Sequence, residues 1–279
     1  MLRLPDGGSL AYAVHSRGAH AKKLPLLLLR PLGGSMVLWG RFREPLLAER
    51  RVVSFDPRGA GRSSAAPFLT STRTLAADAR ALLDHLRIGR AHVFGLSLGG
   101  MVACRLVAAA PERVAGLVLA ATALRGRDVS RPGMKRALSL AACLLRPSAQ
   151  EVEAGLLHRV LSSRFRREHP DETAALEAAV RREPASRAGL VRLATAAALH
   201  DASSELARVC HRALLLWGQE DGLLGPDSQA ALQAALVQAP TQRVVLPKAG
   251  HDLSLERPLA TAGAVLGFLR ACDADPGAA

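Results

Sequence analysis

Short apolar runs, each bounded by turn-forming residues, recur along the chain. The first of them, Leu26 to Leu29, lies between Pro25 and Pro31. A run of this length between two breakers is typical of a strand that is buried on both faces. Further segments that predict strands occupy residues 52–55, 91–94, 114–121, 212–217 and 241–246. Ahead of them, residues 2–4 and 10–15 flank a turn at 5–8 and predict a hairpin.

Between these strands the apolar residues change to a helical period. From Thr72 to Leu86, Asp78, Arg80 and Asp84 lie on one face, and the opposite face is apolar: Leu75, Ala79, Leu82, Leu83 and Leu86. Other helices are predicted at 98–110, 227–237 and 256–271. Strands and helices that alternate in this way favour a parallel sheet covered by helices on both faces. The predicted fold class is therefore α/β, with a mostly parallel, doubly wound sheet.

The alternation stops between about Leu124 and His200. This segment is rich in Ala, Leu, Arg and Glu, contains no plausible strand, and predicts several helices inserted as a cap. A chain of 279 residues is long enough for a core domain with such an insertion. The predicted division is 1–124 for the first part of the core, 125–200 for the helical cap, 201–272 for the second part of the core and 273–279 for a frayed tail.

The segment from Gly95 to Gly99 has the pattern G-x-S-x-G, with Ser97 at its centre. The bare pattern is weak, but here it follows a predicted strand and opens a predicted helix, as a nucleophile elbow requires. In such an elbow the serine has strained backbone geometry, and side chains two residues before and after it would collide. The N–H groups at the start of the helix favour negative charge at the serine oxygen. Ser97 is the predicted nucleophile, and an incidental serine in a glycine-rich turn is the alternative.

A serine hydroxyl needs a base that takes its proton as it attacks. In this strand–turn–helix setting an acid and a histidine follow the serine in sequence, each in a loop after a strand. Asp221 and His251 follow two predicted strands in that order, at the carboxyl ends where an open α/β sheet has its active site. His251 is the predicted base, and Asp221 is predicted to accept its other ring N–H and fix the tautomer. Glu220 is the second candidate for the acid, and Asp227 lies within reach of the same loop.

Composition and charge narrow the classes of function. Hydrophobic residues make up 49% and charged residues 22%, and no apolar run reaches the roughly 18–20 residues of a membrane span. The N-terminus lacks the apolar stretch of a signal peptide. The net charge of +13 comes from scattered arginines beside few aromatic residues, so no nucleic-acid partner is expected. The cysteines form no C-x-x-C pair and indicate reduced thiols in the cytoplasm rather than a metal site or disulfides: Cys104, Cys143, Cys210 and Cys272.

Several segments match, in order, the motifs of one superfamily. They are the D-x-R-G-x-G-x-S-like loop within Phe55 to Ser63, the elbow and helix Gly95 to Ala103, Pro111 to Val114, Leu117 to Leu119, and Gly250-His251 with Glu256-Arg257-Pro258. With them, about residues 2–272 resemble the α/β-hydrolase superfamily, and most of all its lactonases and carboxylesterases related to 3-oxoadipate enol-lactonase. The resemblance implies an α/β-hydrolase fold, a serine–acid–histidine triad and chemistry on ester bonds.

One departure from the family's pattern lies at Arg30-Pro31, where the family usually has His-Gly. By the resemblance, the oxyanion hole consists of the backbone N–H groups of Leu98 and Leu32. Pro31 has no N–H, but the predicted donor is the next residue, so the hole can survive this change. Arg30 either fills the space of the missing histidine and pairs with a carboxylate, or presents its guanidinium to an anionic substrate group. Arg30 and Met36 are the candidate substrate-binding residues.

The sequence thus predicts a serine hydrolase that cleaves a small-to-medium carboxylic ester or lactone. Ser97 attacks, the Leu32 and Leu98 N–H groups stabilise the oxyanion, and His251 moves the proton to the leaving group before water repeats the cycle. A small-molecule substrate is the expected partner, no cofactor or metal is expected, and the oligomeric state is left open. Two alternatives stay open: C–C bond hydrolysis, perhydrolysis or acyl transfer on the same fold, and a non-catalytic protein that binds a ligand in the same pocket.

Overall fold

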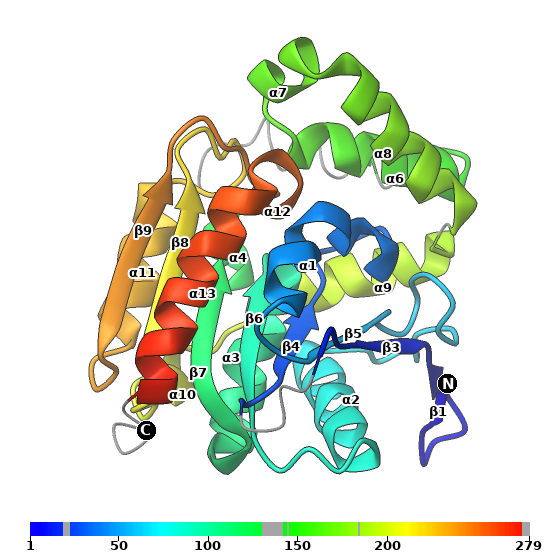
Figure 1. Ribbon diagram of the computed structural model, residues 1–279. Helices are drawn as coiled ribbons and strands as arrows, with labels where there is room; N and C mark the ends of the chain where they lie inside the picture. Colours follow the sequence, from blue (N-terminus) through cyan, green and yellow to red (C-terminus); the bar gives the residue numbers. More distant parts are fainter. Residues whose placement is uncertain (19–22, 130–141, 144, 184, 275–279) are drawn as a thin grey trace.

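The computed structural model describes residues 1–18, 23–129, 142–143, 145–183 and 185–274. Its centre is a seven-stranded sheet (Figure 1) in which every neighbouring pair is parallel, except the edge strand β3, which is antiparallel to β5. The predicted α/β fold class with a mostly parallel sheet is confirmed. In spatial order the strands are β3 (Tyr12–His15), β5 (Val52–Phe55), β4 (Leu26–Leu29), β6 (Ala91–Leu96), β7 (Val114–Ala120), β8 (Ala213–Gly218) and β9 (Thr241–Leu246).

The continuous apolar runs are explained by helices on both faces of the sheet. In β4, Leu27 and Leu29 belong to one hydrophobic cluster and Leu26 and Leu28 to the other, because successive side chains of a strand point to opposite faces. The first cluster is completed by α2 (Thr72–His85), α3 (Leu98–Ala109) and α11 (Pro226–Ala235). The second is completed by the short 3₁₀ helix η1 (Met36–Trp39), α1 (Gly40–Leu47), α12 (Leu253–Glu256) and α13 (Pro258–Ala274). A second 3₁₀ turn, η2 (Pro111–Arg113), leads into β7.

The two chain ends differ from the sequence predictions. The predicted hairpin is shorter, since only β1 (Leu2–Arg3) and β2 (Ser9–Leu10) pair with each other, and β3 turns away to join the main sheet at β5. At the other end, α13 continues past Cys272 to Ala274. The carboxylate of Asp273 is 3.0 Å from Arg50 Nη2 and 2.9 Å from His92 Nε2, which ties this residue to the core. Residues 275–279 of the predicted tail lie outside the described residues.

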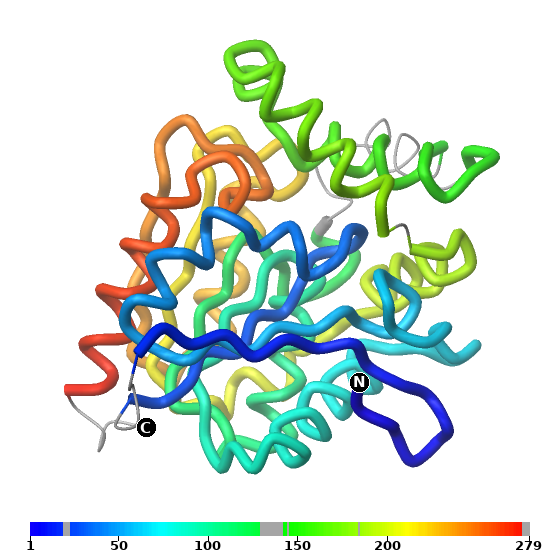
Figure 2. The backbone as a smooth tube through the Cα atoms, turned by 45° about the vertical axis from the view of Figure 1, so that its right-hand side comes forward, coloured from blue at the N-terminus to red at the C-terminus, as the bar shows by residue number. Residues whose placement is uncertain are grey.

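In the described residues between β7 and β8 the regular elements are helices, joined by turns and loops, with one isolated β-bridge between Arg125 and Asp201. Ser148, Ser162 and Ser186 accept hydrogen bonds from backbone N–H groups of the helices that follow them, which explains where three of these helices begin. Figures 1 and 2 place α6, α7 and α8 beyond the end of the sheet toward which β8 and β9 run. The helices are α4 (Gly126–Val129), α6 (Ala149–Val160), α7 (Ser163–Glu168), α8 (Pro170–Arg182), α9 (Arg187–Ala198) and α10 (Ser203–Leu206).

No helix in the described part of the chain is both long and apolar enough to cross a bilayer.

Candidate active site

Ser97 stands at the turn between β6 and α3 in a backbone conformation that only a tight local structure imposes. Its φ is +54° and its ψ is −117°, although it is not a glycine. A Cβ on Gly95 would lie 2.4 Å from the carbonyl oxygen of Gly99, and a Cβ on Gly99 would lie 2.1 Å from that of Leu29. Neither contact is sterically possible, so the glycines of the G-x-S-x-G segment are required by space. The turn presents the serine side chain at the end of β6.

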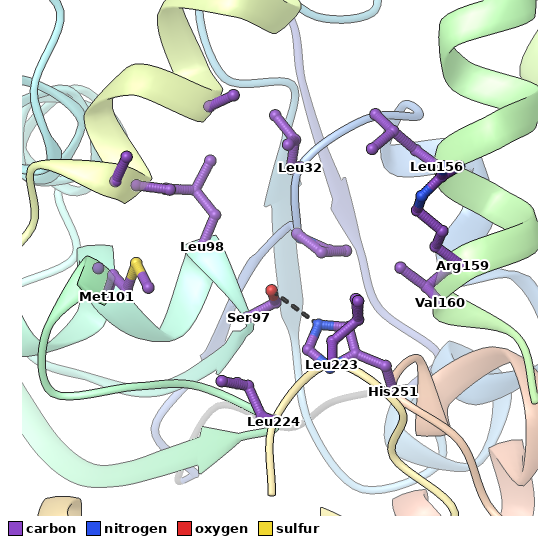
Figure 3. Close-up of a pocket in the computed structure, with 15 residues that line it drawn as sticks. Leu32, Ser97, Leu98, Met101, Leu156, Arg159, Val160, Leu223, Leu224 and His251 are labelled. Atoms are coloured by element: carbon purple, nitrogen blue, oxygen red, sulfur yellow. Dashed lines mark hydrogen bonds between the residues drawn. The ribbon is translucent and has the colours of Figure 1, made fainter. Parts of the chain in front are cut away.

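A continuous line of hydrogen bonds joins Ser97, His251 and Asp221. Ser97 Oγ is 2.9 Å from His251 Nε2 (Figure 3), and His251 Nδ1 is 2.8 Å from Asp221 Oδ2. The other oxygen of Asp221 accepts from the backbone N–H groups of Leu223 and Leu224 at 2.8 and 3.0 Å. The side chains of His251 and Asp221 are 3% and 2% exposed. The structure therefore brings together the three residues that the sequence selected and holds the carboxylate in one orientation.

The charges around His251 raise its pKa and so stabilise its protonated form. Burial lowers the pKa of His251, but the charge and hydrogen bond of Asp221, together with the charges of Asp252 and Glu256, outweigh burial, so the pKa lies above the ordinary value of 6.5. An imidazole with a raised pKa is a stronger base toward a serine hydroxyl. The arrangement can take a proton from Ser97 and stabilise the resulting imidazolium.

The other two acidic candidates are engaged elsewhere. A carboxylate oxygen of Glu220 lies 2.7 Å from Arg164 Nε on α7, so this side chain turns toward the cap. Asp227 is in the first turn of α11, where a negative charge favours the helix N-terminus. Asp221 is the candidate that contacts His251.

Leu98 and Leu32, the expected oxyanion donors, both line the space in front of Ser97. Leu98 is the first residue of α3, so its N–H has no acceptor within the helix. The loop that carries Leu32 packs tightly against the same helix end, because a Cβ on Gly99 would lie 2.8 Å from the carbonyl oxygen of Arg30. Both segments therefore meet at the nucleophile.

An apolar cavity of about 130 Å³ opens at Ser97 (Figure 3). In that view Leu98 and Met101 of α3 stand on one side of Ser97, and Leu156, Arg159 and Val160 of α6 stand on the other. Arg159 and His251 are the residues with ionisable side chains among the described residues that line it. The other lining residues are Pro31, Leu32, Gly126, Ala194, Ala197, Ala198, Leu223 and Leu224.

Neither Arg30 nor Met36 is among the described residues that line the cavity at Ser97. Arg30 is 4% exposed, its guanidinium lies 4.7 Å above the Trp39 ring, and Nη2 is 4.0 Å from Asp252 Oδ2. This favours the alternative in which Arg30 fills space and pairs with a carboxylate. Met36 is not among the residues that line the cavity. It is buried, and its backbone N–H donates to Asp56 Oδ1, so the expected substrate contact of Met36 is not supported.

Glu256, for which the sequence pattern predicts no role, connects the histidine loop to the cap. The carboxylate of Glu256 accepts from the N–H of Gly250 at 2.9 Å, and from the N–H and hydroxyl of Ser162 at 2.5 and 2.8 Å. Next to it, the N–H of Asp252 donates to the carbonyl of Val160. Glu256 was visible as part of a matching motif, but nothing in the sequence pattern pairs it with a serine 94 residues away.

In the described part of the chain, no group of three or more His, Cys, Asp or Glu side chains could hold a metal ion.

The fold and this elbow define a class. Residues 25–258 match the family model described as the alpha/beta hydrolase fold, and the chain belongs to this family. Among solved structures, a hydrolase from Pseudomonas aeruginosa PA01 is 31% identical with a TM-score of 0.82, covering 96% of this chain and 97% of its own. The enol-lactonase from Burkholderia xenovorans LB400 has the same fold at a TM-score of 0.77 and 23% identity, covering 95% of this chain and 98% of its own.

Two of the relatives that match in sequence over most of this chain come from Pseudomonas species. One is the dihydrolipoyllysine-residue acetyltransferase component of the acetoin cleaving system of Pseudomonas putida, 31% identical over 88% of this chain. This chain spans 63% of the length of that relative. The other is RutD of Pseudomonas syringae pv. syringae, named as a carbamate hydrolase, 31% identical over 90% of this chain and 95% of its own length. The resemblance to the α/β-hydrolase superfamily, with esterase- and lactonase-like relatives, is confirmed.

Proposed function

We propose that this protein is a serine hydrolase that cleaves a carboxylic ester or lactone through an acyl-enzyme. The observation that carries the proposal is the line of hydrogen bonds from Ser97 through His251 to Asp221, which ends at an apolar cavity. A serine, a histidine and a carboxylate that are hydrogen-bonded in this order activate the serine for nucleophilic attack on a carbonyl carbon. The family and the relatives named as hydrolases support the reaction class.

The reaction follows from the positions of these groups. Ser97 Oγ attacks the carbonyl carbon while its proton passes to His251 Nε2, and the carbonyl oxygen gains the negative charge. The N–H groups of Leu32 and Leu98 stabilise that charge. The intermediate collapses when His251 returns the proton to the departing alkoxide, leaving an ester on Ser97. Water, deprotonated by His251, then attacks this ester and releases the carboxylic acid and the free serine.

The cavity indicates the size and polarity of the acyl group. Its volume of about 130 Å³ is close to that of an apolar cavity of about 150 Å³ that binds benzene. An unbranched acyl chain of about four to six carbons fills such a space. Its walls are mainly Leu, Ala and Val side chains, which favour an uncharged chain.

Acyl transfer is the second candidate. The similarity to the acetyltransferase component of the Pseudomonas putida system favours it. The acyl-enzyme would be the same, and an alcohol or thiol would replace water in the second half of the reaction.

The test uses a fluorophosphonate probe together with p-nitrophenyl esters of two to twelve carbons and a panel of lactones. We expect the wild type to be labelled and to hydrolyse the short esters, and Ser97→Ala to do neither. Ser204→Ala, a change at an exposed serine, should behave as wild type. Equal labelling of wild type and Ser97→Ala, or turnover by both, would overturn the proposal. Added short-chain alcohols or thiols that yield new esters or thioesters would identify acyl transfer.

A further inference from the structure

Glu153 of α6 is a buried carboxylate that contacts the loop carrying Leu32. Its side chain is 2% exposed, and Oε1 accepts a hydrogen bond of 3.0 Å from the N–H of Gly34. Oε2 is buried as well, and the backbone N–H of Ala185 also acts on this carboxylate. A buried ionisable group costs free energy unless its surroundings favour it, and the triad makes no use of this one. Its contact joins the cap to the core, next to the nucleophile.

The loop at residues 30–34 depends on outside contacts for its position. Gly33 and Gly34 have φ values of +82° and +68°, a region that glycine enters freely and other residues rarely, so this local conformation is not fixed by side chains of the two glycines themselves. Helix α6 supplies two contacts from one face, since residues three apart on a helix are neighbours. Glu153 binds Gly34, and the Leu156 side chain lies 3.4 Å from where a Cβ on Gly33 would be. The cap thus touches both glycines that follow Leu32.

We propose that Glu153 is a positioning residue for the oxyanion hole: its hydrogen bond to Gly34 holds the Leu32 N–H where the oxyanion forms, most firmly when the carboxyl group is ionised. The inference rests on the proposed function, because it uses Leu32 as an oxyanion donor. A hydrogen bond to an ionised acceptor is roughly twice as strong as one to a neutral acceptor. A shift of a fraction of an ångström at such a donor weakens transition-state stabilisation more than substrate binding.

The ionisation of Glu153 falls in the neutral pH range. Burial raises the pKa of Glu153 to about 7, although the N–H groups of Gly34 and Ala185 act in the opposite direction. The contact with Gly34 therefore strengthens as the pH rises through about 7.

Few charges face Glu153 from the elements around it. A cavity of about 20 Å³ lies beside it, and the other charged residues among those described as lining it are Arg30 and Asp252, which have opposite signs. Helix α8 contributes Val180 to that cavity, and α9 reaches Gly33 through Leu190. Neither helix presents a charge there.

The test compares wild type with Glu153→Gln, which keeps an oxygen acceptor but has no proton to lose. The kcat of wild type divided by the kcat of Glu153→Gln, measured on a p-nitrophenyl ester, should be near 1 below pH 6. It should rise to about tenfold above pH 8, with a midpoint near 7, while KM changes less than about twofold. His251 titrates in both proteins, so its effect cancels in the ratio. A ratio that is constant with pH would overturn the assignment.

Glu151→Gln is the matched control, because Glu151 is an exposed glutamate on the same helix. Its ratio to wild type should stay near 1 at every pH. A second measurement needs no variant: the amide proton resonance of Gly34 in wild type should move downfield with a midpoint near pH 7, and a static resonance would overturn the contact. Absence of turnover and of Ser97 labelling in wild type would instead overturn the proposed function. Turnover with a constant ratio counts against Glu153 alone.

Discussion

At the scale of single residues, Asp221 is the part of the candidate triad whose role can be separated from packing. Asp221→Asn keeps the size of the side chain, but a neutral amide no longer stabilises the imidazolium and can favour the wrong histidine tautomer. We expect kcat to fall by roughly 10³–10⁴-fold with the fold intact. Ester hydrolysis and thermal unfolding measure the two effects. Glu220→Gln, at the neighbouring carboxylate that contacts Arg164, should change kcat by less than about threefold. Similar losses of kcat in both variants would contradict the assignment of Asp221 as the acid of the triad.

His251 should determine the acidic side of the pH profile. The base works only when it is neutral, so activity falls as the pH drops through its pKa, and the raised pKa places that midpoint above 6.5. Without the charge of Asp221, burial remains as the main influence and lowers the pKa. The residual kcat/KM of Asp221→Asn should then fall at a lower pH than that of wild type. Both pH profiles are best measured in proteins that also carry Glu153→Gln, because this substitution removes the titration of Glu153. An unchanged midpoint would contradict this electrostatic coupling.

Residue-level prediction from sequence worked where the signal was local. Ser97 could be selected because its glycines, strand and helix are adjacent in the chain, and His251 because it follows a strand in the expected order. The partners of Glu153 and Glu256 could not be predicted. Their hydrogen bonds join residues 119 and 94 positions apart, and no period or motif records which cap residue meets which core loop.

At the scale of elements, α9 should control the length of the acyl chain. This helix contributes three small side chains to the cavity wall, those of Ala194, Ala197 and Ala198. Ala197→Leu adds three carbons to a space of about 130 Å³ and should exclude longer chains. We expect kcat/KM for a hexanoate ester to fall by roughly 10–100-fold while that for an acetate ester changes less than about threefold.

Thr195→Leu, on an exposed position of the same helix, provides the control for added bulk. It should leave the preference for chain length unchanged. Equal losses on both esters in Ala197→Leu would show that this part of α9 does not line the acyl site.

Elements were predictable in proportion to the strength of their pattern. The strands buried on both faces are continuous apolar runs, and most of their predicted bounds are close to the observed ones. Helix α1 (Gly40–Leu47) was missed because it has Pro45 inside and few apolar positions, although Phe42 and Leu46 are fully buried. The return strand β3 was assigned to a hairpin, since its pairing with β5 depends on residues about 40 positions away.

At the scale of the whole molecule, α6 connects the two halves of the candidate site. Glu153 near its start contacts the loop that carries Leu32, and the carbonyl of Val160 at its end accepts from the N–H of Asp252, next to His251. One helix therefore holds both the predicted oxyanion donor and the base. The ionised carboxylate of Glu153 strengthens the hydrogen bond to the loop, but it is costly to bury. Its ionisation should therefore raise kcat and lower the free energy of unfolding.

This opposition predicts how stability depends on pH. The pKa of Glu153 is about 7 in the folded state and near its ordinary value of 4.5 when unfolded. Between these values the folded state binds more protons than the unfolded state, so this residue lowers the free energy of unfolding as the pH rises, and its effect is constant above about 7. Glu153→Gln lacks the effect. Its stability relative to wild type should increase by about 2–3 kcal/mol from pH 5 to pH 8, since each pKa unit corresponds to about 1.4 kcal/mol.

Urea unfolding at both pH values measures this change, and the same variant should be the slower enzyme at pH 8. Glu151→Gln should show a nearly constant difference from wild type, because an exposed carboxylate titrates similarly in both states. A stability difference for Glu153→Gln that does not vary with pH would mean that the folded protein holds this carboxyl group at its ordinary pKa. The pH-dependent hold on the oxyanion loop would then lose its physical basis, whatever the kinetic effect of the substitution.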